Sequence, residues 1–300
     1  MSNASLRLAR LETRSRLLQA LRRFFVGRSY VEVETPVRIE TPALESHIDA
    51  EPCGEAYLRT SPELHMKRLV CEGMERIFQI GPCFRRGEFG RLHRPEYTML
   101  EWYCAGAGYL DAVAETRDLM RAICQEMLGA ERFIHDGRTV NVGGDWALFD
   151  VAETFVRTAG WNPAERFDAD RFDMDWVAKV EPALPVDVPV VLMDFPAEAA
   201  ALARCRPGPP PVAERWELYV AGVELANAFG ELTDATEQRR RFEVAAAQRA
   251  ARGQPVYPLD EAFLAALEKG MPDCAGVALG VDRLAMLLAG ADSIGAVRAF

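Results

Sequence analysis

The sequence predicts an α+β fold, in which an antiparallel sheet is flanked by helices. Two strand-like stretches, 76–84 and 96–104, follow each other closely, and so do 214–221 and 223–232. Strands joined by short connections pair antiparallel. Helical periodicity is grouped before and after these strands instead of alternating with them, and no internal repeat is visible. This grouping is typical of α+β proteins and not of parallel α/β proteins.

Composition and charge narrow the class further. The chain has 300 residues, of which 49% are apolar and 27% charged, as in folded globular proteins and unlike disordered or fibrous chains. That length suffices for a large core. A net charge of −10 repels polyanions, so any binding of nucleic acid would need a local basic patch.

The cysteines and the apolar runs indicate the cellular compartment in which the protein is expected. The seven cysteines lie twelve or more residues apart, which excludes the CxxC spacing of zinc and redox sites and predicts reduced thiols. No apolar run reaches the roughly 18 residues of a membrane span. We therefore expect a cytoplasmic protein that does not associate with a membrane.

The elements of the N-terminal part follow from local patterns. Residues 5–27 have helical periodicity, with Ser5 as the N-cap and Gly27 as the stop. Alternation and composition predict strands at 30–34, 56–60, 76–84 and 96–104, with a helix at 62–71. We expect the last three of these strands to be neighbours in one antiparallel sheet.

The remaining elements complete a single predicted domain, 1–300. An amphipathic helix covers 111–128, and short helical patterns with proline-rich breaks follow, up to a run rich in Pro at 206–211. We expect a helical insertion at about 111–212. The elements after it are strands at 214–221 and 223–232, helices at 235–252 and 260–269, a strand at 276–280 and a helix at 281–288.

One face of the strand at 96–104 carries candidate ligand-binding groups. Because side chains alternate along a strand, Tyr97, Met99, Glu101 and Tyr103 point to the same side. A carboxylate and phenols among apolar groups suit recognition of a small ligand with a charged end. The strand alone leaves open a half-exposed sheet whose polar groups are only solvated.

Two further clusters suit a metal ion or an anion. Glu217 and Glu224, on neighbouring strands, can hold Mg²⁺ together with substrate phosphates, although solvated surface acids have the same spacing. The small residues of 276–280 let a ligand approach the backbone closely. Arg283 lies in the first turn of the next helix, where the helix dipole disfavours a cation unless that cation binds an anion.

Together these clusters resemble the three signature motifs of the class II aminoacyl-tRNA synthetase catalytic core, in its lysyl branch. Residues 24–36 are similar to motif 1, 84–103 to motif 2 and 276–283 to motif 3, so the resemblance covers almost the whole chain. It implies the fold of that core, and it also implies a homodimer formed through motif 1, with Pro36 at the interface.

The resemblance is greater to one group of stand-alone paralogues of these synthetases. Lysyl-tRNA synthetases carry an anticodon-binding domain before motif 1, and here a single helix precedes that motif, so we expect no such domain and no tRNA substrate. The amino-acid sequences of segments 60–68, 224–227 and 271–280 are similar to those of the family that attaches (R)-β-lysine to a lysine side chain of elongation factor P. Elongation factor P and (R)-β-lysine are the partners that this resemblance implies.

The resemblance implies ATP and Mg²⁺ as cofactors and assigns roles around the nucleotide. Arg85 would bridge the substrate carboxylate and the α-phosphate, a role that suits a planar fork of donors. His93 and Arg283 would bind the outer phosphates, and Tyr97 would stack on adenine. The metal ligands would be Glu217 and Glu224.

The amino-acid end of the site would be acidic, because the substrate is cationic and a buried ammonium group has to be paired. By the resemblance, Glu101, Glu231 and Tyr103 would bind the side-chain ammonium group. The remaining contacts would come from Glu63 to the other amine and from Asn227 to the carboxylate.

Two positions depart from the pattern of the family. The motif 2 sequence Arg-x-Glu reads Arg85-Arg86-Gly87-Glu88 here, so the acid is either absent or displaced by one position. The glycine that tRNA-ligating relatives have in motif 3 is Ala278. Its added methyl group beside the amino acid would favour β-lysine over α-lysine.

Other functions stay open from the sequence. A truncated lysyl-tRNA synthetase paralogue would act on tRNA, against which the acidic balance argues. An aspartate-activating amide ligase would need a cation where Glu101 and Glu231 stand. A catalytically inactive, lysine-binding regulator would have lost phosphate or metal residues, whereas those named above are all present.

Overall fold

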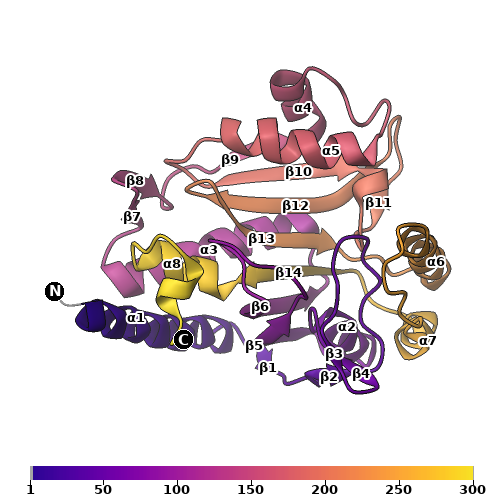
Figure 1. Ribbon diagram of the computed structural model, residues 1–300, viewed down its shortest axis with the longest axis horizontal. Coiled ribbons are helices and arrows are strands. Elements are labelled where there is room, and N and C mark those ends of the chain that lie inside the picture. Colours follow the sequence, from indigo (N-terminus) through magenta and orange to yellow (C-terminus); the bar gives the residue numbers. More distant parts are fainter. Residues whose placement is uncertain (1–2, 300) are drawn as a thin grey trace.

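The computed structural model describes residues 3–299, and in that part of the chain nine strands form the main sheet (Figure 1). Eight of them are ordered β1 (Val31–Glu32), β5 (Arg76–Phe84), β6 (Glu96–Ala105), β14 (Cys274–Gly280), β13 (Val223–Gly230), β12 (Val212–Val220), β10 (Val190–Pro196) and β9 (Ala147–Asp150). The ninth, β11 (Cys205–Arg206), pairs with β12. All pairs are antiparallel except β1 with β5 and β10 with β9. The predicted α+β class is confirmed.

Two smaller sheets lie outside the main one. Strand β4 (Ala56–Leu58) pairs with β2 (Arg38–Ile39) and β3 (Pro52–Cys53), and β7 (Arg132–His135) forms a hairpin with β8 (Arg138–Asn141). The expectation that the strand at 56–60 neighbours the next two strands was therefore wrong. Strand type is set locally, but the choice of partner depends on the rest of the fold.

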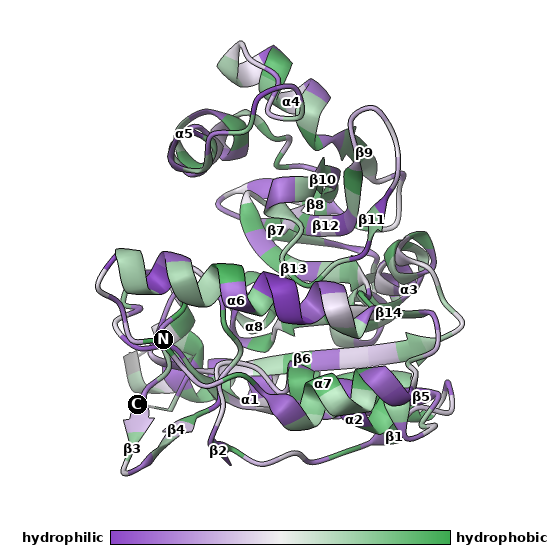
Figure 2. Cartoon of the chain, turned by 90° about the vertical axis from the view of Figure 1, so that its right-hand side faces the viewer, coloured by the Kyte–Doolittle hydropathy of each residue, from purple (hydrophilic) through white to green (hydrophobic). Residues whose placement is uncertain are grey.

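One face of the main sheet is closed by α1 (Asn3–Val26), α3 (Tyr109–Leu128) and α8 (Val281–Leu288). Their apolar sides share one core cluster with inward residues of the strands, among them Trp102, Trp216 and Val277. The long helices are banded with hydrophobic and hydrophilic residues, as helices with one buried side should be (Figure 2). Helix α1 begins two residues before Ser5, the expected cap.

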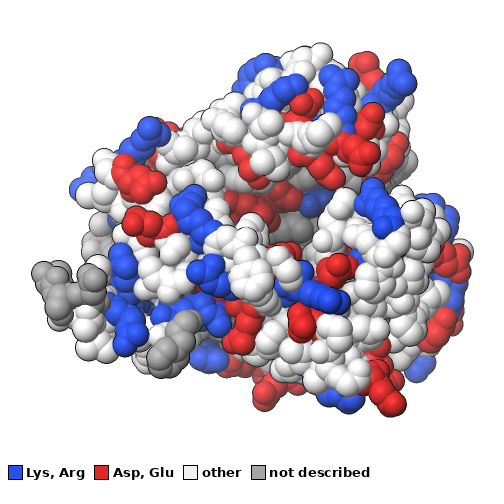
Figure 3. Space-filling model, viewed as in Figure 1, with Lys and Arg blue, Asp and Glu red and all other residues white. Residues whose placement is uncertain are grey.

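The opposite face is covered only at its two ends. At one end lie α2 (Glu63–Cys71), α6 (Ala235–Ala251) and α7 (Glu261–Lys269), around a second core cluster. At the other end α4 (Val151–Ala159), α5 (Ala169–Asp175) and the π-helical turn η1 (Trp176–Val180) pack on β10 and β12 around a third. Short 3₁₀ turns complete the chain: η2 (Glu181–Ala183), η3 (Ala197–Ala199) and η4 (Ile294–Val297). Between the two ends the surface is hollowed (Figure 3).

The segment at about 111–212 is less helical than expected. Besides α3, α4 and α5 it contains five strands, and β9 and β10 extend the main sheet. Strand β10 is buried over most of its length, so its run Val190-Val191-Leu192 is apolar throughout. A strand buried on both faces lacks the alternation that marks a strand in sequence.

The chain shows two further expected features. The seven cysteines are free thiols. No helix between residues 3 and 299 is long and apolar enough to cross a bilayer.

Candidate active site

A row of residues crosses the open face of the sheet at one level. Glu101 on β6 is paired in register with Ala278 on β14, Ala278 with Asn227 on β13, and Asn227 with Glu217 on β12. Because cross-strand partners point to the same face, these four side chains form a continuous floor. The sheet register thus brings together four residues that the sequence proposed separately.

Glu101 lies at the buried end of this floor. Its carboxylate accepts hydrogen bonds from the Ser61 hydroxyl at 2.7 Å and from the Tyr103 hydroxyl at 3.0 Å, and the residue is 1% exposed. Burial raises the pKa of Glu101 to about 7; the nearby charge of Glu63 adds to the rise, while the two hydrogen bonds and Lys67 oppose it. Because burial outweighs the charge of Lys67, an added ammonium group would stabilise the charged form of this carboxylate.

Glu63 and Glu231 are joined by a cation that the sequence analysis did not single out. The ammonium group of Lys67 lies 2.5 Å from Glu63 Oε1 and 2.5 Å from Glu231 Oε2. Burial raises the pKa of Glu231, and Lys67 works against that rise. The spacing of Glu63 and Lys67, four residues apart on α2, was the signal available in the sequence.

Strand β14 approaches this acidic pocket so closely that Gly276 leaves no room for a side chain. A Cβ atom there would lie 2.2 Å from Glu231 Oε1 and 2.4 Å from the Tyr103 ring. The glycine therefore lets both groups pack against the backbone.

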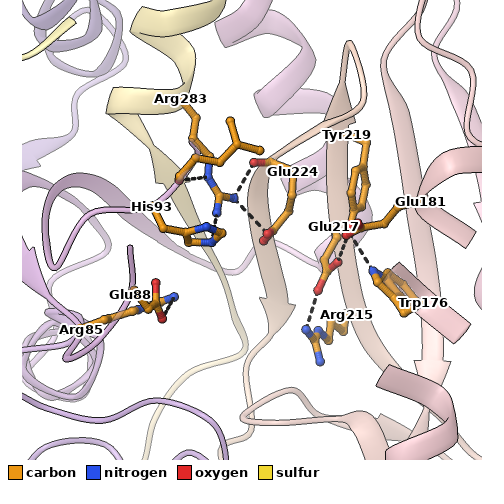
Figure 4. Close-up of polar contacts among 11 residues, drawn as sticks. Arg85, Glu88, His93, Trp176, Glu181, Arg215, Glu217, Tyr219, Glu224 and Arg283 are labelled. Atoms are coloured by element: carbon orange, nitrogen blue, oxygen red, sulfur yellow. Dashed lines mark hydrogen bonds and ion pairs between the residues drawn. The ribbon is translucent and has the colours of Figure 1, made fainter. Parts of the chain in front are cut away.

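Beside the floor, where β14 leads into α8, Arg283 and His93 lie together (Figure 4). Arg283 donates to the Glu224 carboxylate at 3.0 Å, to the Glu224 backbone oxygen at 2.7 Å, and to Nε2 of His93 at 2.9 Å. Arginine is only a donor, so Nε2 is the unprotonated nitrogen of the ring. Two cation-bearing elements, the motif 2 connection and α8, thus meet beside one carboxylate.

Arg85, which directly follows β5, packs beside Tyr97 on β6. Its guanidinium carbon is 5.3 Å from the centre of the Tyr97 ring, and its buried Nε has no hydrogen-bond partner within residues 3–299. The carboxylate of Glu88 lies 3.9 Å from the guanidinium group of Arg85. The chain turns between them at Gly87, which has a φ of +79°. The Tyr97 hydroxyl donates to the Thr60 backbone oxygen at 2.9 Å.

Glu217 shares its pocket with an arginine and a tyrosine that the sequence analysis missed. Arg215 donates to one carboxylate oxygen at 2.6 Å and the Tyr219 hydroxyl to the other at 3.0 Å. Burial raises the pKa of Glu217 to about 7, with Arg215 opposing the rise and Glu224 adding to it. Tyr219 is held in turn by Trp176 and Glu181 (Figure 4).

The two acids Glu217 and Glu224 fit a hard cation that is completed by substrate oxygens. No group of three or more His, Cys, Asp or Glu side chains in the described part of the chain is arranged to hold a metal by itself. Mg²⁺ characteristically takes one or two protein carboxylates together with phosphate oxygens and waters. The raised pKa of Glu217 indicates a carboxylate that an added cation would stabilise.

A cavity of about 1160 Å³ opens over Arg215, Glu217 and Asn227 and extends between α5 and α6. It corresponds to the hollow in Figure 3. Its volume exceeds the usual range for a small-molecule pocket, roughly 300–1,000 Å³. The cavity therefore exposes the part of the floor that carries Glu217 and Asn227.

The structure brings the proposed site residues to one face of the sheet and to its rim. The contacts of Arg85, His93 and Tyr97 with any ligand stay predictions, as do those of the acids and of Ala278. The sequence analysis missed Lys67, Ser61, Arg215 and Tyr219, whereas Gly276 lies in the run of small residues, 276–280, that it did single out.

Comparison with known proteins places this arrangement in a family. The profile of the class II tRNA synthetases (D, K and N) matches residues 3–300. The chain is similar to proteins named elongation factor P–(R)-β-lysine ligase. That of Klebsiella pneumoniae subsp. pneumoniae is 40% identical over 96% of this chain and 93% of its own length. Those of Proteus mirabilis and Vibrio cholerae are 39% and 38% identical, each over 98% of this chain and 95% of their own length.

Proposed function

The chain belongs to the class II tRNA synthetase family, and on that premise we propose that it activates (R)-β-lysine with ATP and transfers it to a lysine side chain of elongation factor P. The observation that supports the proposal is the floor of the sheet, where the register aligns Glu101 of the acidic pocket with Asn227 and Glu217, and Glu224 on the same strand as Asn227 pairs with Arg283 beside His93. The acidic pocket suits a diamino acid, and Arg283 with His93 suits the phosphates of a nucleotide.

The first half-reaction joins the substrate carboxylate to the α-phosphate as pyrophosphate leaves. The chain contributes positioning and charge stabilisation. Arg85, with an unpaired buried Nε, supplies donors between carboxylate and α-phosphate. His93 and Arg283 hold the outer phosphates, and Tyr97 holds the adenine. On the amino-acid side, Glu63, Glu101, Tyr103, Asn227 and Glu231 bind the polar ends of the substrate.

The second half-reaction forms an amide. The neutral amine of the acceptor lysine attacks the carbonyl carbon of the adenylate, so that a C–N bond forms, the C–O bond to AMP breaks and AMP leaves. The ammonium form of the acceptor gives up two protons in all, to the AMP phosphate and to solvent. The large cavity provides the room through which a protein-borne lysine reaches the floor.

Glu217 and Glu224 would hold Mg²⁺ in this proposal, and the ion would supply positive charge beside the phosphates. Glu224→Gln should abolish Mg²⁺-dependent ATP–pyrophosphate exchange with (R)-β-lysine, with an unchanged circular dichroism spectrum. Glu243→Gln, at an exposed position of α6, is the control and should exchange normally. Undiminished exchange in Glu224→Gln would remove the metal assignment.

The acceptor is tested by intact mass. Elongation factor P incubated with this protein, ATP and (R)-β-lysine should gain the mass of one lysyl group, and Arg85→Ala should give no gain. The net charge of −10 argues against tRNA, because phosphate contacts dominate nucleic-acid affinity. Efficient charging of tRNA at physiological salt would contradict the proposed acceptor.

We also propose that the protein is a cytoplasmic homodimer that pairs through the motif 1 region. Val26 and Val31 are 60% and 51% exposed there, and β1 is an edge strand. Light scattering should give twice the chain mass of 33.4 kDa, and Val31→Asp should shift it towards the single chain. Val256→Asp, which changes an exposed valine elsewhere, should leave the dimer intact.

A further inference from the structure

Lys67 is a buried charge for which the proposed reaction has so far given no role. Its side chain is 1% exposed, and it lies on α2 with its ammonium group between Glu63 and Glu231. The Phe229 ring lies on another side, 5.9 Å from the ammonium nitrogen to the ring centre. The two carboxylates outweigh burial and raise the pKa of Lys67, so the group stays charged.

Lysine is a rare residue in this chain. Of its 35 basic residues, only Lys67, Lys179 and Lys269 are lysines. A compact ammonium group can lie between two carboxylates that approach from different elements, whereas the planar fork of arginine suits one carboxylate at a time. The geometry at this position therefore favours a compact ammonium group over a guanidinium group.

The charges around Lys67 can be counted, because few groups face the pocket. Glu63, Glu101 and Glu231 are its acids, and their mutual effects appear in the raised pKa of both Glu101 and Glu231. Tyr103, whose pKa is raised far above its ordinary value, is neutral. When the ammonium groups of a bound substrate keep all three acids ionised, three carboxylates and the Lys67 ammonium group leave two net negative charges.

Two net negative charges match an amino acid that carries two ammonium groups. We propose that Lys67 is a specificity-determining positioning residue, which ties Glu63 to Glu231 and sets the pocket charge so that a diamino acid is bound in preference to a monoamino acid. The inference rests on the proposed function. Without Lys67 the pocket would hold three buried acids, one too many for the two cations of the substrate, and buried unpaired charge is strongly disfavoured.

A role in packing alone predicts something different. Methionine has nearly the length and volume of lysine, so Lys67→Met would fill the same space without the charge. If packing were the whole role, the identity of the substrate would not change the effect of the substitution. The charge role instead predicts that a second substitution, which restores the count, restores function.

The experiment is a charge series with ATP–pyrophosphate exchange as the readout. Lys67→Met leaves three negative charges, Glu231→Gln leaves one, and the double variant again leaves two. Each is measured with (R)-β-lysine and with 6-aminohexanoate, which has one ammonium group. Lys179→Met is the matched control, because Lys179 also pairs with an acid four residues away, Asp175, but at an exposed position.

We expect each single variant to lose on the order of 100-fold in kcat/KM for (R)-β-lysine, mainly through KM, as when one partner of a buried charge pair is removed. The double variant should exceed both single variants and keep the preference for the diamino acid. Glu231→Gln alone should narrow that preference, and Lys179→Met should match the wild type.

Other results would overturn the inference in distinguishable ways. Losses that simply multiply in the double variant, or an unchanged substrate preference throughout the series, would remove the charge role of Lys67 and leave the proposed function in place. No exchange in the wild type would overturn the proposed function and the inference with it. If Lys67→Met does not fold, the comparison of Glu231→Gln with the double variant decides alone.

Discussion

Ala278 shows how much a single methyl group can decide when its neighbours are fixed by the sheet. It lies between Glu101 and Asn227 in the cross-strand row, hence between the groups proposed to bind the side-chain ammonium group and the carboxylate. The α-amine of α-lysine lies next to its carboxylate, whereas the amine of β-lysine is one carbon further along. A methyl group that crowds the first need not crowd the second.

Ala278→Gly should raise kcat/KM for α-lysine relative to (R)-β-lysine by about 10–200-fold, the range for one methyl group in a close-fitting pocket. The ratio is measured by pyrophosphate exchange with both isomers. Ala275→Gly on the same strand is the control, because Ala275 faces the core on the other side of the sheet. It should lower stability and leave the ratio alone. An unchanged ratio in Ala278→Gly would make Ala278 a packing residue only.

Among the elements, β14 shapes the site most, because it has no large side chain on the floor side of the sheet. Its residues alternate between the core, where Val277 and Leu279 pack, and the floor, where Gly276 lets Tyr103 and Glu231 approach the backbone. Gly276→Ala should displace both groups, because the new Cβ would lie 2.2 Å from the Glu231 carboxylate. KM for (R)-β-lysine should rise at least tenfold, which corresponds to a loss of about 1.4 kcal/mol or more in binding free energy. KM for ATP should change little.

The control for this element is Gly108→Ala at the start of α3. There an added Cβ would meet Asp111 at 3.6 Å, an ordinary contact. Its kinetic constants should equal those of the wild type. Equal increases of KM for ATP and for the amino acid in Gly276→Ala would indicate a general distortion of the sheet and contradict the local explanation.

At the scale of the whole molecule, the buried acids of the site lower the stability of the ligand-free native protein when they are ionised. Glu101 and Glu217 have pKa values raised from 4.5 to about 7. Between these values the native protein retains protons that the unfolded chain has lost, so stability falls as pH rises from about 4.5 to 7. Each pKa unit corresponds to about 1.4 kcal/mol per group.

Thermal unfolding of the ligand-free protein should therefore give a lower Tm at pH 7.5 than at pH 5.5. (R)-β-Lysine should raise Tm more at the higher pH, where its cations replace the lost protons. Glu101→Gln should flatten part of the pH dependence, because it removes one of the titrating groups. A Tm that rises over this interval in the wild type would contradict the raised pKa values of these two carboxylates.

The sequence by itself determined the local structure and the chemical types at the site. The strand at 76–84 and the helix at 281–288 were predicted with the bounds of β5 and α8, because alternation, helical periodicity and caps are written in neighbouring residues. Glu101 and Arg283 could be singled out from such local patterns, whereas Arg85 was identified through the resemblance to motif 2.

Only the tertiary structure decided which of these residues meet. The alignment of Glu101, Ala278, Asn227 and Glu217 depends on the register of four strands that come from distant parts of the chain. The addition of β9 and β10 to the sheet and the placement of Lys67 between two acids depend equally on long-range packing. Such contacts are selected by the free energy of burying the whole sheet and pairing its charges, and this is not encoded in any short stretch of sequence.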